Sequence, residues 1–256
     1  MKEKLYTIPL NDAVNANDEC PFCYLERKLE QDLMDFVLGN GSSYMESDIR
    51  ADTDKSGFCR THFKKMFDYG NALGNAWILK THYRKTIDEM KKQFHGHTSV
   101  KMGLFEKKKS SNERKNDRKN SIGRWTAERE NTCYICDRFR LEYPRYLDTF
   151  LYLYEKDKDF KEKILHGKGF CLTHFGDLCE HASVKLNPKQ QQEFFPPLFA
   201  LMTENMERIY DDVSWMIEKF HYENKDADWK NSKDAVQRGM QKLKGSYPAD
   251  PVYKKR

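Results

Sequence analysis

The chain has 256 residues, of which 38% are hydrophobic and 33% are charged, with a formal net charge of +5. A chain of this length can form one large or two small domains. No segment approaches the ~20 apolar residues of a membrane span, and the first eleven residues lack the apolar run of a signal peptide. We therefore expect a cytoplasmic protein with no membrane partner.

The first hundred residues predict three helices. Residues 1–19 lack periodicity and are expected to be an extended lead-in to Cys20-Pro21-Phe22-Cys23. Apolar residues then follow at helical spacing as far as Gly39, residues 42–55 are polar and irregular, and a second helix is expected from Cys59 to about Gly70. A third is predicted over 72–94, with His82 beside its apolar stripe as a packed or surface histidine.

The basic charge is concentrated in residues 99–124, which hold nine Lys or Arg against three acids, while the rest of the chain has a net charge of −1. We expect a flexible connector, because such a composition buries little apolar surface. The alternative is weak nucleic-acid binding through phosphate neutralisation, which has little support because aromatic residues are not interleaved. The candidate residues for it are Lys107, Lys108, Lys109, Arg114, Lys115, Arg118 and Lys119.

The second half repeats this plan. A helix is predicted after Cys133-Tyr134-Ile135-Cys136, with Pro144 marking its start or a bend. Another begins at Cys171. The longest apolar pattern runs from Leu198 to Phe220, with Pro196 and Pro197 expected at its N-terminus, and its simplest partner is the 72–94 helix rather than a dimer seam. A short last helix is expected after an N-cap at Ser232 and before Gly245.

One heptapeptide occurs twice, and this duplication organises the chain. Gly57-Phe58-Cys59-Arg60-Thr61-His62-Phe63 returns as Gly169-Phe170-Cys171-Leu172-Thr173-His174-Phe175, with one difference. The offset between the two CxxC pairs is almost the same as the offset between the two CxxH pairs. The chain is therefore predicted to contain an internal repeat.

Each repeat carries the ligand set of a structural zinc site. Two cysteines with two residues between them wrap one edge of a tetrahedron, and a CxxH pair on the first turn of a helix provides the other edge. We assign one zinc to Cys20, Cys23, Cys59 and His62, and a second to Cys133, Cys136, Cys171 and His174. This assignment follows chain order, and a cross-paired arrangement would use the same residues.

The main alternative is thiol redox chemistry at the CxxC pairs, either as a sensor or as an oxidoreductase. The thioredoxin-like fold needs a βαβ unit around its CxxC, yet only a short segment precedes Cys20 and helical patterns follow both pairs. Another metal, such as an iron-sulfur cluster, is a further alternative. The seventh cysteine, Cys179, is expected to be a buried small hydrophobe.

Several short segments of the chain are distinctive. They are Tyr6-Thr7-Ile8-Pro9, Asn11-Asp12-Ala13, Glu19-Cys20-Pro21-Phe22-Cys23, Ser43-Tyr44-Met45-Glu46, Gly57-Phe58-Cys59, Thr81-His82 and Asn231-Ser232-Lys233-Asp234-Ala235. Together they resemble an uncharacterised bacterial domain-of-unknown-function family over nearly the full chain. The resemblance implies that the lead-in and the late segment belong to the fold. That family is often labelled as ABC transporter substrate-binding proteins, a label that nothing in these residues supports.

The sequence thus predicts an all-α protein of two zinc-nucleated units packed through long helices. The expected organisation is a first unit over 1–98, a basic connector over 99–126, a second unit over 127–225, a short helix within 226–245 and a frayed tail over 246–256. Its expected function is that of a non-catalytic binding or scaffold module with two zinc ions, an unknown protein partner and a monomeric or homodimeric state. No catalytic constellation is recognisable.

Overall fold

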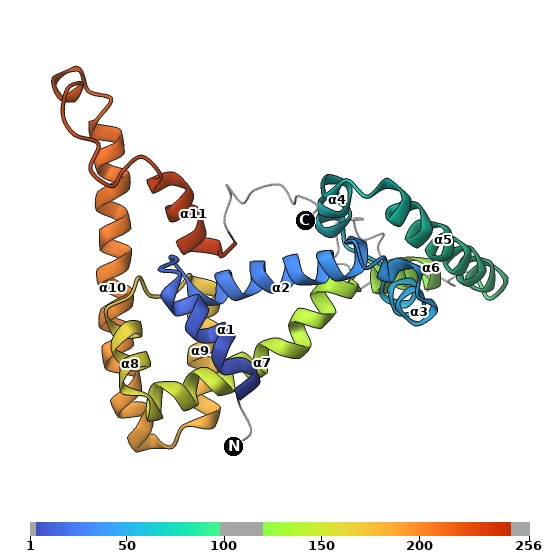
Figure 1. Cartoon of the computed structure of the whole chain (residues 1–256), viewed down its shortest axis with the longest axis horizontal. Helices are drawn as coiled ribbons and strands as arrows, with labels where there is room; N and C mark the ends of the chain where they lie inside the picture. Colours follow the sequence, from blue (N-terminus) through green and yellow to red (C-terminus); the bar gives the residue numbers. More distant parts are fainter. Residues whose placement is uncertain (1–3, 98–119, 247–256) are drawn as a thin grey trace, which may run out of the picture. The chain divides into compact units, whose positions relative to one another are not determined.

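The computed structural model describes residues 4–97 and 120–246, which form eleven α-helices and two 3-10 turns without a strand (Figure 1). The all-α prediction is confirmed. The helices are α1 (Lys4–Asn15), α2 (Pro21–Leu38), α3 (Ser47–Ser56), α4 (Arg60–Tyr69), α5 (Ala72–His95), α6 (Ser121–Glu130), α7 (Tyr134–Lys156), α8 (Lys158–Leu165), α9 (Leu172–Lys185), α10 (Pro188–Glu218) and α11 (Ala235–Lys244). Among them, none combines the length and apolar character needed to cross a membrane.

The described residues pack into two compact units, and each unit combines segments from both repeats. Unit one comprises 4–29 and 141–246, and unit two comprises 30–97 and 120–140. The boundaries fall inside α2 and α7, so each of these helices contributes to both units. This division differs from the sequential one into 1–98 and 127–225, because each CxxC segment packs with the CxxH segment of the other repeat.

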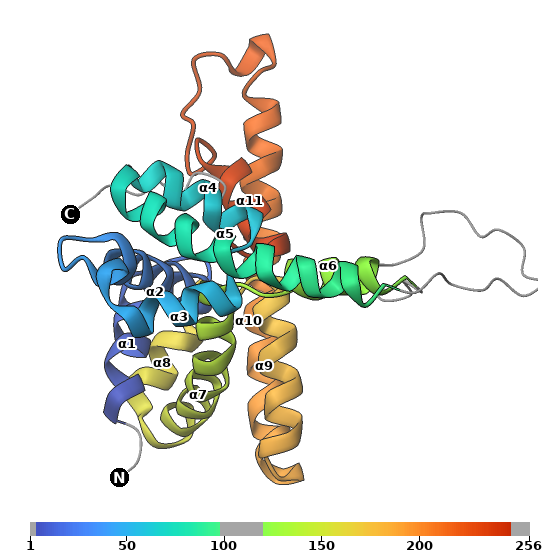
Figure 2. The ribbon, with the colours of Figure 1, turned by 90° about the vertical axis from the view of Figure 1, so that its right-hand side faces the viewer.

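Unit one is built on aromatic packing around Phe22 and Phe150, both fully buried. The Phe22 ring lies 5.5 Å from that of Phe150 and 5.8 Å from that of Phe170, close to the CxxH segment. Helices α8, α9 and α11 all contact α10, and α11 lies beside it (Figures 1 and 2). Leu198 and Met202 of the α10 stripe lie in the core of unit one, whereas Phe220 at the end of the stripe is 76% exposed.

Unit two has a smaller core in which the side chains of α2, α4 and α5 meet the start of α7. Its buried members include Met34, Met66, Ile78 and Ile135. Helix α5 contacts α3, α4 and α6. Asn71 caps α5 by accepting from the backbone N–H of Gly74, which explains why this helix starts where the sequence predicted.

Three expectations about irregular segments were wrong. The lead-in forms α1, which buries Leu10 and Ala13 against the core of unit one. The polar segment 42–55 contains a 3-10 turn (Ser43–Met45) and α3, and the end of the expected connector contains α6. These helices are short, and α3 and α6 are mostly polar, so apolar periodicity alone does not identify them.

Two expectations about helix boundaries also need correction. Pro196 and Pro197 lie inside α10, whose true N-terminus is a capping box formed by Asn187 and Gln190. Asp234, not Ser232, precedes α11; Ser232 is buried and its hydroxyl donates to the carbonyl of Trp229. Pro144, expected to mark a helix start or a bend, lies inside α7.

Candidate metal centres

The first centre lies in unit one and consists of Cys20, Cys23, Cys171 and His174. All four residues are buried, and their four possible ligand atoms lie within 4.8 Å of one another. His174 Nδ1 lies 3.4 Å from Cys20 Sγ, 3.4 Å from Cys23 Sγ and 3.2 Å from Cys171 Sγ. Three sulfur atoms therefore face one imidazole nitrogen.

The spacing of these atoms fits a tetrahedral metal. Cys23 Sγ and Cys171 Sγ are 3.7 Å apart, far longer than a disulfide bond and close to the ~3.8 Å edge expected for thiolates at ~2.3 Å from zinc. All seven cysteines are free thiols. The cluster could therefore hold a metal ion at its centre with little movement of the ligands.

The second centre lies in unit two and consists of Cys59, His62, Cys133 and Cys136. His62 Nδ1 is 3.2 Å from Cys59 Sγ, 3.1 Å from Cys133 Sγ and 3.4 Å from Cys136 Sγ. The geometry thus repeats that of the first centre. It differs in exposure, because Cys59 and Cys136 are partly exposed whereas all the ligands of the first centre are buried.

A carboxylate orients the histidine of the second centre. His62 Nε2 lies 2.7 Å from Glu30 Oε1, and Lys65 binds the same carboxylate at 2.6 Å from Oε2. If Nε2 carries the proton and donates it to Glu30, the Nδ1 lone pair points at the three thiols. This carboxylate–histidine arrangement is typical of metal-binding histidines and increases their basicity as ligands.

The thiols and histidines of the two clusters shift one another's pKa values. Burial opposes protonation of His62, but the thiolate of Cys133 and the carboxylate of Glu30 raise its pKa to about 10. A hydrogen bond from Cys136 lowers the pKa of Cys133 to about 3, and hydrogen bonds from Cys20 and Cys23 lower the pKa of Cys171 strongly. The thiolate is the form of cysteine that binds metals, and a metal ion would replace the protons that these thiols and imidazoles share.

The chain-order assignment of ligands is wrong for both centres. The structure brings Cys20 and Cys23 together with Cys171 and His174, and it brings Cys59 and His62 together with Cys133 and Cys136. The eight residues are those identified from the sequence, but both quartets are cross-paired. The spacing within each CxxC or CxxH pair fixes one edge of a tetrahedron. It does not determine which CxxC shares a metal with which CxxH.

Glycine allows each CxxH segment to turn toward its CxxC partner. Gly57 and Gly169 have φ angles of +61° and +71°, which L side chains rarely adopt. In unit two the carbonyl of Gly57 accepts a hydrogen bond of 2.9 Å from the backbone N–H of Tyr134, the residue after Cys133. In unit one the equivalent position is Pro21, which has no N–H to donate.

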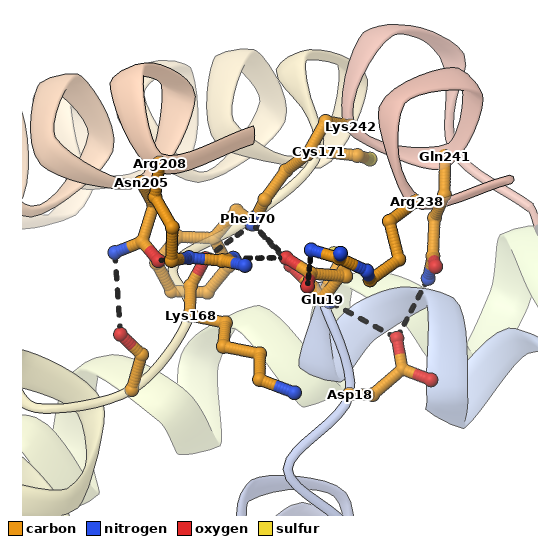
Figure 3. A network of polar contacts seen from close by, with 12 residues as sticks. Asp18, Glu19, Lys168, Phe170, Cys171, Asn205, Arg208, Arg238, Gln241 and Lys242 are labelled. Carbon is orange, nitrogen blue, oxygen red and sulfur yellow. Dashed lines mark hydrogen bonds and ion pairs between the residues drawn. The ribbon is translucent and has the colours of Figure 1, made fainter. Parts of the chain in front are cut away.

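A buried lysine joins the two ligand segments of unit one instead (Figure 3). Lys242 of α11, 1% exposed, donates through Nζ to the backbone carbonyls of Glu19 and Lys168 and lies 3.2 Å from Glu19 Oε2. These residues directly precede Cys20 and Gly169. Lys242 thus fixes both segments from one helix, although burial lowers its own pKa despite the nearby Glu19.

Further ion pairs surround Glu19, which is itself 3% exposed. Arg208 Nη2 lies 2.5 Å from Glu19 Oε2, and Arg238 Nη1 lies 3.7 Å from Glu19 Oε1 (Figure 3). Arg238 Nη1 also lies 2.8 Å from Asp212 Oδ2. The end of α11 also covers the thiols. A Cβ on Gly245 would lie 3.3 Å from Cys171 Sγ and 3.6 Å from Cys23 Sγ.

The supporting residues Glu30, Glu19, Lys242 and Gly245 were missed as parts of the site. Glu19 adjoins Cys20, and Gly245 was identified only as a helix end. The apolar periodicity of α11 predicts the wrong buried face. The apolar residues Val236, Met240 and Leu243 are 42%, 53% and 51% exposed. The polar residues Arg238, Gln241 and Lys242 are buried instead. Nothing in the sequence distinguishes these buried polar side chains from surface ones.

Three further sets of residues were singled out in the sequence. Lys107, Lys108, Lys109, Arg114, Lys115, Arg118 and Lys119 lie outside the described residues. Cys179 is partly exposed and belongs to neither quartet. His82 packs in unit two, where Nδ1 lies 3.2 Å from the carbonyl of Asp54.

The chain was compared with protein families, curated proteins and solved structures. The model of a family of unknown function, DUF6062, matches residues 1–250. The chain belongs to this family. No curated protein and no solved structure matches the chain. DUF6062 membership therefore agrees with the resemblance seen in the sequence and assigns no activity, so the chemistry of the two Cys₃His clusters is the available guide to function.

Proposed function

We propose that this protein binds two zinc ions as structural cofactors and works as a non-catalytic binding or scaffold module. The observation that carries this proposal is the approach of three thiols and one imidazole nitrogen within 4.8 Å of one another, twice. Three sulfur ligands and one nitrogen ligand are the donor set that zinc prefers over harder cations.

Four protein ligands fill the tetrahedron and leave no position for water or substrate, so each zinc would have a structural role. Cross-pairing of the quartets defines this structural role more closely. Each ion would join segments that are distant in sequence, as the separation of 71 residues between His62 and Cys133 illustrates. Binding energy of roughly 10–16 kcal/mol for a structural zinc would then stabilise contacts between the two repeats.

Metal ligation by thiolates also favours a reducing compartment, because oxidising conditions convert paired cysteines into disulfides. We therefore keep a cytoplasmic location as part of the proposal. Three further points remain predictions: the protein partner, the oligomeric state and nucleic-acid binding through residues 99–124.

The experiment is to measure the zinc content of untagged protein, purified without added metal or chelator, by plasma mass spectrometry. Free thiols are titrated in parallel before and after unfolding. The proposal expects two zinc ions per chain, with six thiols protected until the protein unfolds. Metal-free folded protein with Cys20–Cys23 or Cys133–Cys136 disulfides would overturn it and favour thiol redox chemistry.

A further inference from the structure

A polar pocket opens beside Glu19 in unit one. Its volume is about 820 Å³, within the range of roughly 300–1,000 Å³ that small-molecule sites occupy. Four parts of the chain line it: the segment before Cys20, the turn after α8, one face of α10, and residues 230–238. We call it the Glu19 pocket.

The lining of the Glu19 pocket carries an excess of positive charge. Five Lys or Arg and three Asp or Glu line it, a net charge of +2 with His166 neutral. The arginines are paired with carboxylates, Arg208 with Glu19 and Arg238 with Asp212 and Asp234. The excess therefore comes from the lysines of the lining.

These lysines have no carboxylate partner among the described residues. Lys168 donates to the backbone carbonyl of Asn17, Lys230 lies 4.0 Å from the ring centroid of Trp215, and neither these two nor Lys233 forms an ion pair within 4–97 and 120–246. Lys230 and Lys233 are exposed. An anion in the pocket would therefore not have to displace a carboxylate from any of these three lysines.

Arg208 adds a donor of fixed orientation. Its Nε donates to Asn205 Oδ1 at 3.0 Å and its Nη2 to Glu19 at 2.5 Å, so the guanidinium is held on two sides (Figure 3). Asn205 is buried and is itself held by donation to the carbonyls of Gly167 and Leu201. The remaining terminal nitrogen, Nη1, has no hydrogen-bond partner among the described residues.

We propose that the Glu19 pocket binds a phosphate group, either as inorganic phosphate or as the phosphate of a small organic monoester. A preorganised guanidinium matches the oxygen geometry of phosphate, and lysine ammonium groups act as point charges around it. The carboxylates of Glu204 and Asp234 at the same pocket can accept hydrogen bonds from hydroxyl groups of an ester. None of the eight metal ligands lines this pocket, so phosphate binding there is a property separate from metal ligation.

The test is a titration of the full chain, with its metal content measured, by two-dimensional amide NMR and calorimetry. Inorganic phosphate is the first probe; glucose 6-phosphate and adenosine monophosphate follow, with glucose and adenosine as uncharged counterparts. We expect saturable shifts at Gly167 and Lys168 with a Kd of about 1 mM or below, weakened by added salt. A monoester that binds tenfold tighter than inorganic phosphate identifies the organic form as the occupant, and equal affinities identify inorganic phosphate.

Two variants of equal charge change provide the control. Lys230→Ala with Lys233→Ala removes both exposed lysines from the pocket, whereas Lys158→Ala with Lys189→Ala removes two exposed lysines of unit one outside it. Both should fold and retain their metal. We expect phosphate affinity to fall about tenfold or more in the pocket variant and less than twofold in the control. Two results would overturn the proposal. One is that the wild type shows no binding at 10 mM phosphate, a concentration that corresponds to a binding free energy of roughly 3 kcal/mol. The other is an equal loss of affinity in both variants.

Discussion

His62 Nε2 lies 2.7 Å from Glu30 Oε1, on the side of the imidazole ring opposite the three thiols of the second centre. Glu30 is 9% exposed and its carboxylate is also bound by Lys65. The pair fixes which nitrogen of His62 faces the thiols. It therefore connects a residue outside the metal quartet to the affinity of that quartet.

Substitution Glu30→Gln should weaken zinc binding at the second centre by about 10- to 100-fold, because loss of the carboxylate reduces the basicity of His62. Chelator competition monitored by native mass spectrometry measures this change. The first centre in the same molecule is the internal control and should keep its affinity. Equal weakening at both centres would contradict a local effect of Glu30.

The two centres should differ in resistance to oxidation. Cys59 and Cys136 are partly exposed, whereas Cys20, Cys23 and Cys171 are each 0% exposed. Hydrogen peroxide should therefore oxidise two thiolates of the second centre to a disulfide, with reduction of peroxide to water and release of one zinc, before the first centre reacts. Native mass spectrometry should detect a one-zinc species, and mapping of modified cysteines should place the disulfide in unit two. Earlier oxidation of the first centre would contradict this.

Lys242→Ala should destabilise unit one strongly. The substitution leaves the carbonyls of Glu19 and Lys168 without their donor and removes one partner of a carboxylate that is 3% exposed. We expect a loss of about 2–5 kcal/mol in the free energy of unfolding, measured with urea. Lys244→Ala, an exposed lysine on the same helix, is the matched control and should change stability by less than about 0.5 kcal/mol.

His82 should make stability fall in weak acid. Burial, and then the charge of Arg129, lower its pKa below the usual value of 6.5. Because the folded pKa lies below the unfolded one, the stabilising contribution is complete above about pH 6.5 and is lost as pH falls toward the folded value. The difference in melting temperature between wild type and His82→Gln should therefore shrink from about pH 7.5 to about pH 5.5. A difference that is constant with pH would contradict the shift.

Much of the fold and all eight candidate ligands were accessible from the sequence. Strong periodicity located α5 and α10, and the repeated heptapeptide identified Cys59 and Cys171 as the starts of α4 and α9, which they precede as N-caps. The pairing of the ligands could not be predicted. Because the two repeats have the same spacing, each CxxC can share a metal with the CxxH of its own repeat or with that of the other. The pairing depends on which segments meet in the folded chain, and that is a tertiary property.

Buried polar groups explain why the inward face of α11 was missed. Lys242, Arg238 and Gln241 are buried because they bind Glu19 or Asp18 and backbone carbonyls, not because they are apolar. Single-sequence reasoning treats such residues as the solvated face of a helix, since charged side chains are almost never fully buried unless paired. Their partners are distant in the chain, as the separation of 223 residues between Lys242 and Glu19 shows.

The central claim is that each metal is held by the CxxC of one repeat and the CxxH of the other. Zinc stoichiometry of two double variants tests it most directly, with each protein purified in the same way and measured by native mass spectrometry. Cys20→Ser with Cys171→Ser changes one centre of this structure, whereas Cys20→Ser with Cys59→Ser changes both. Cys20→Ser with Cys171→Ser should retain one zinc, and Cys20→Ser with Cys59→Ser should retain none. The opposite result, one zinc retained by Cys20→Ser with Cys59→Ser and none by Cys20→Ser with Cys171→Ser, would show that each repeat binds its own metal and would contradict it.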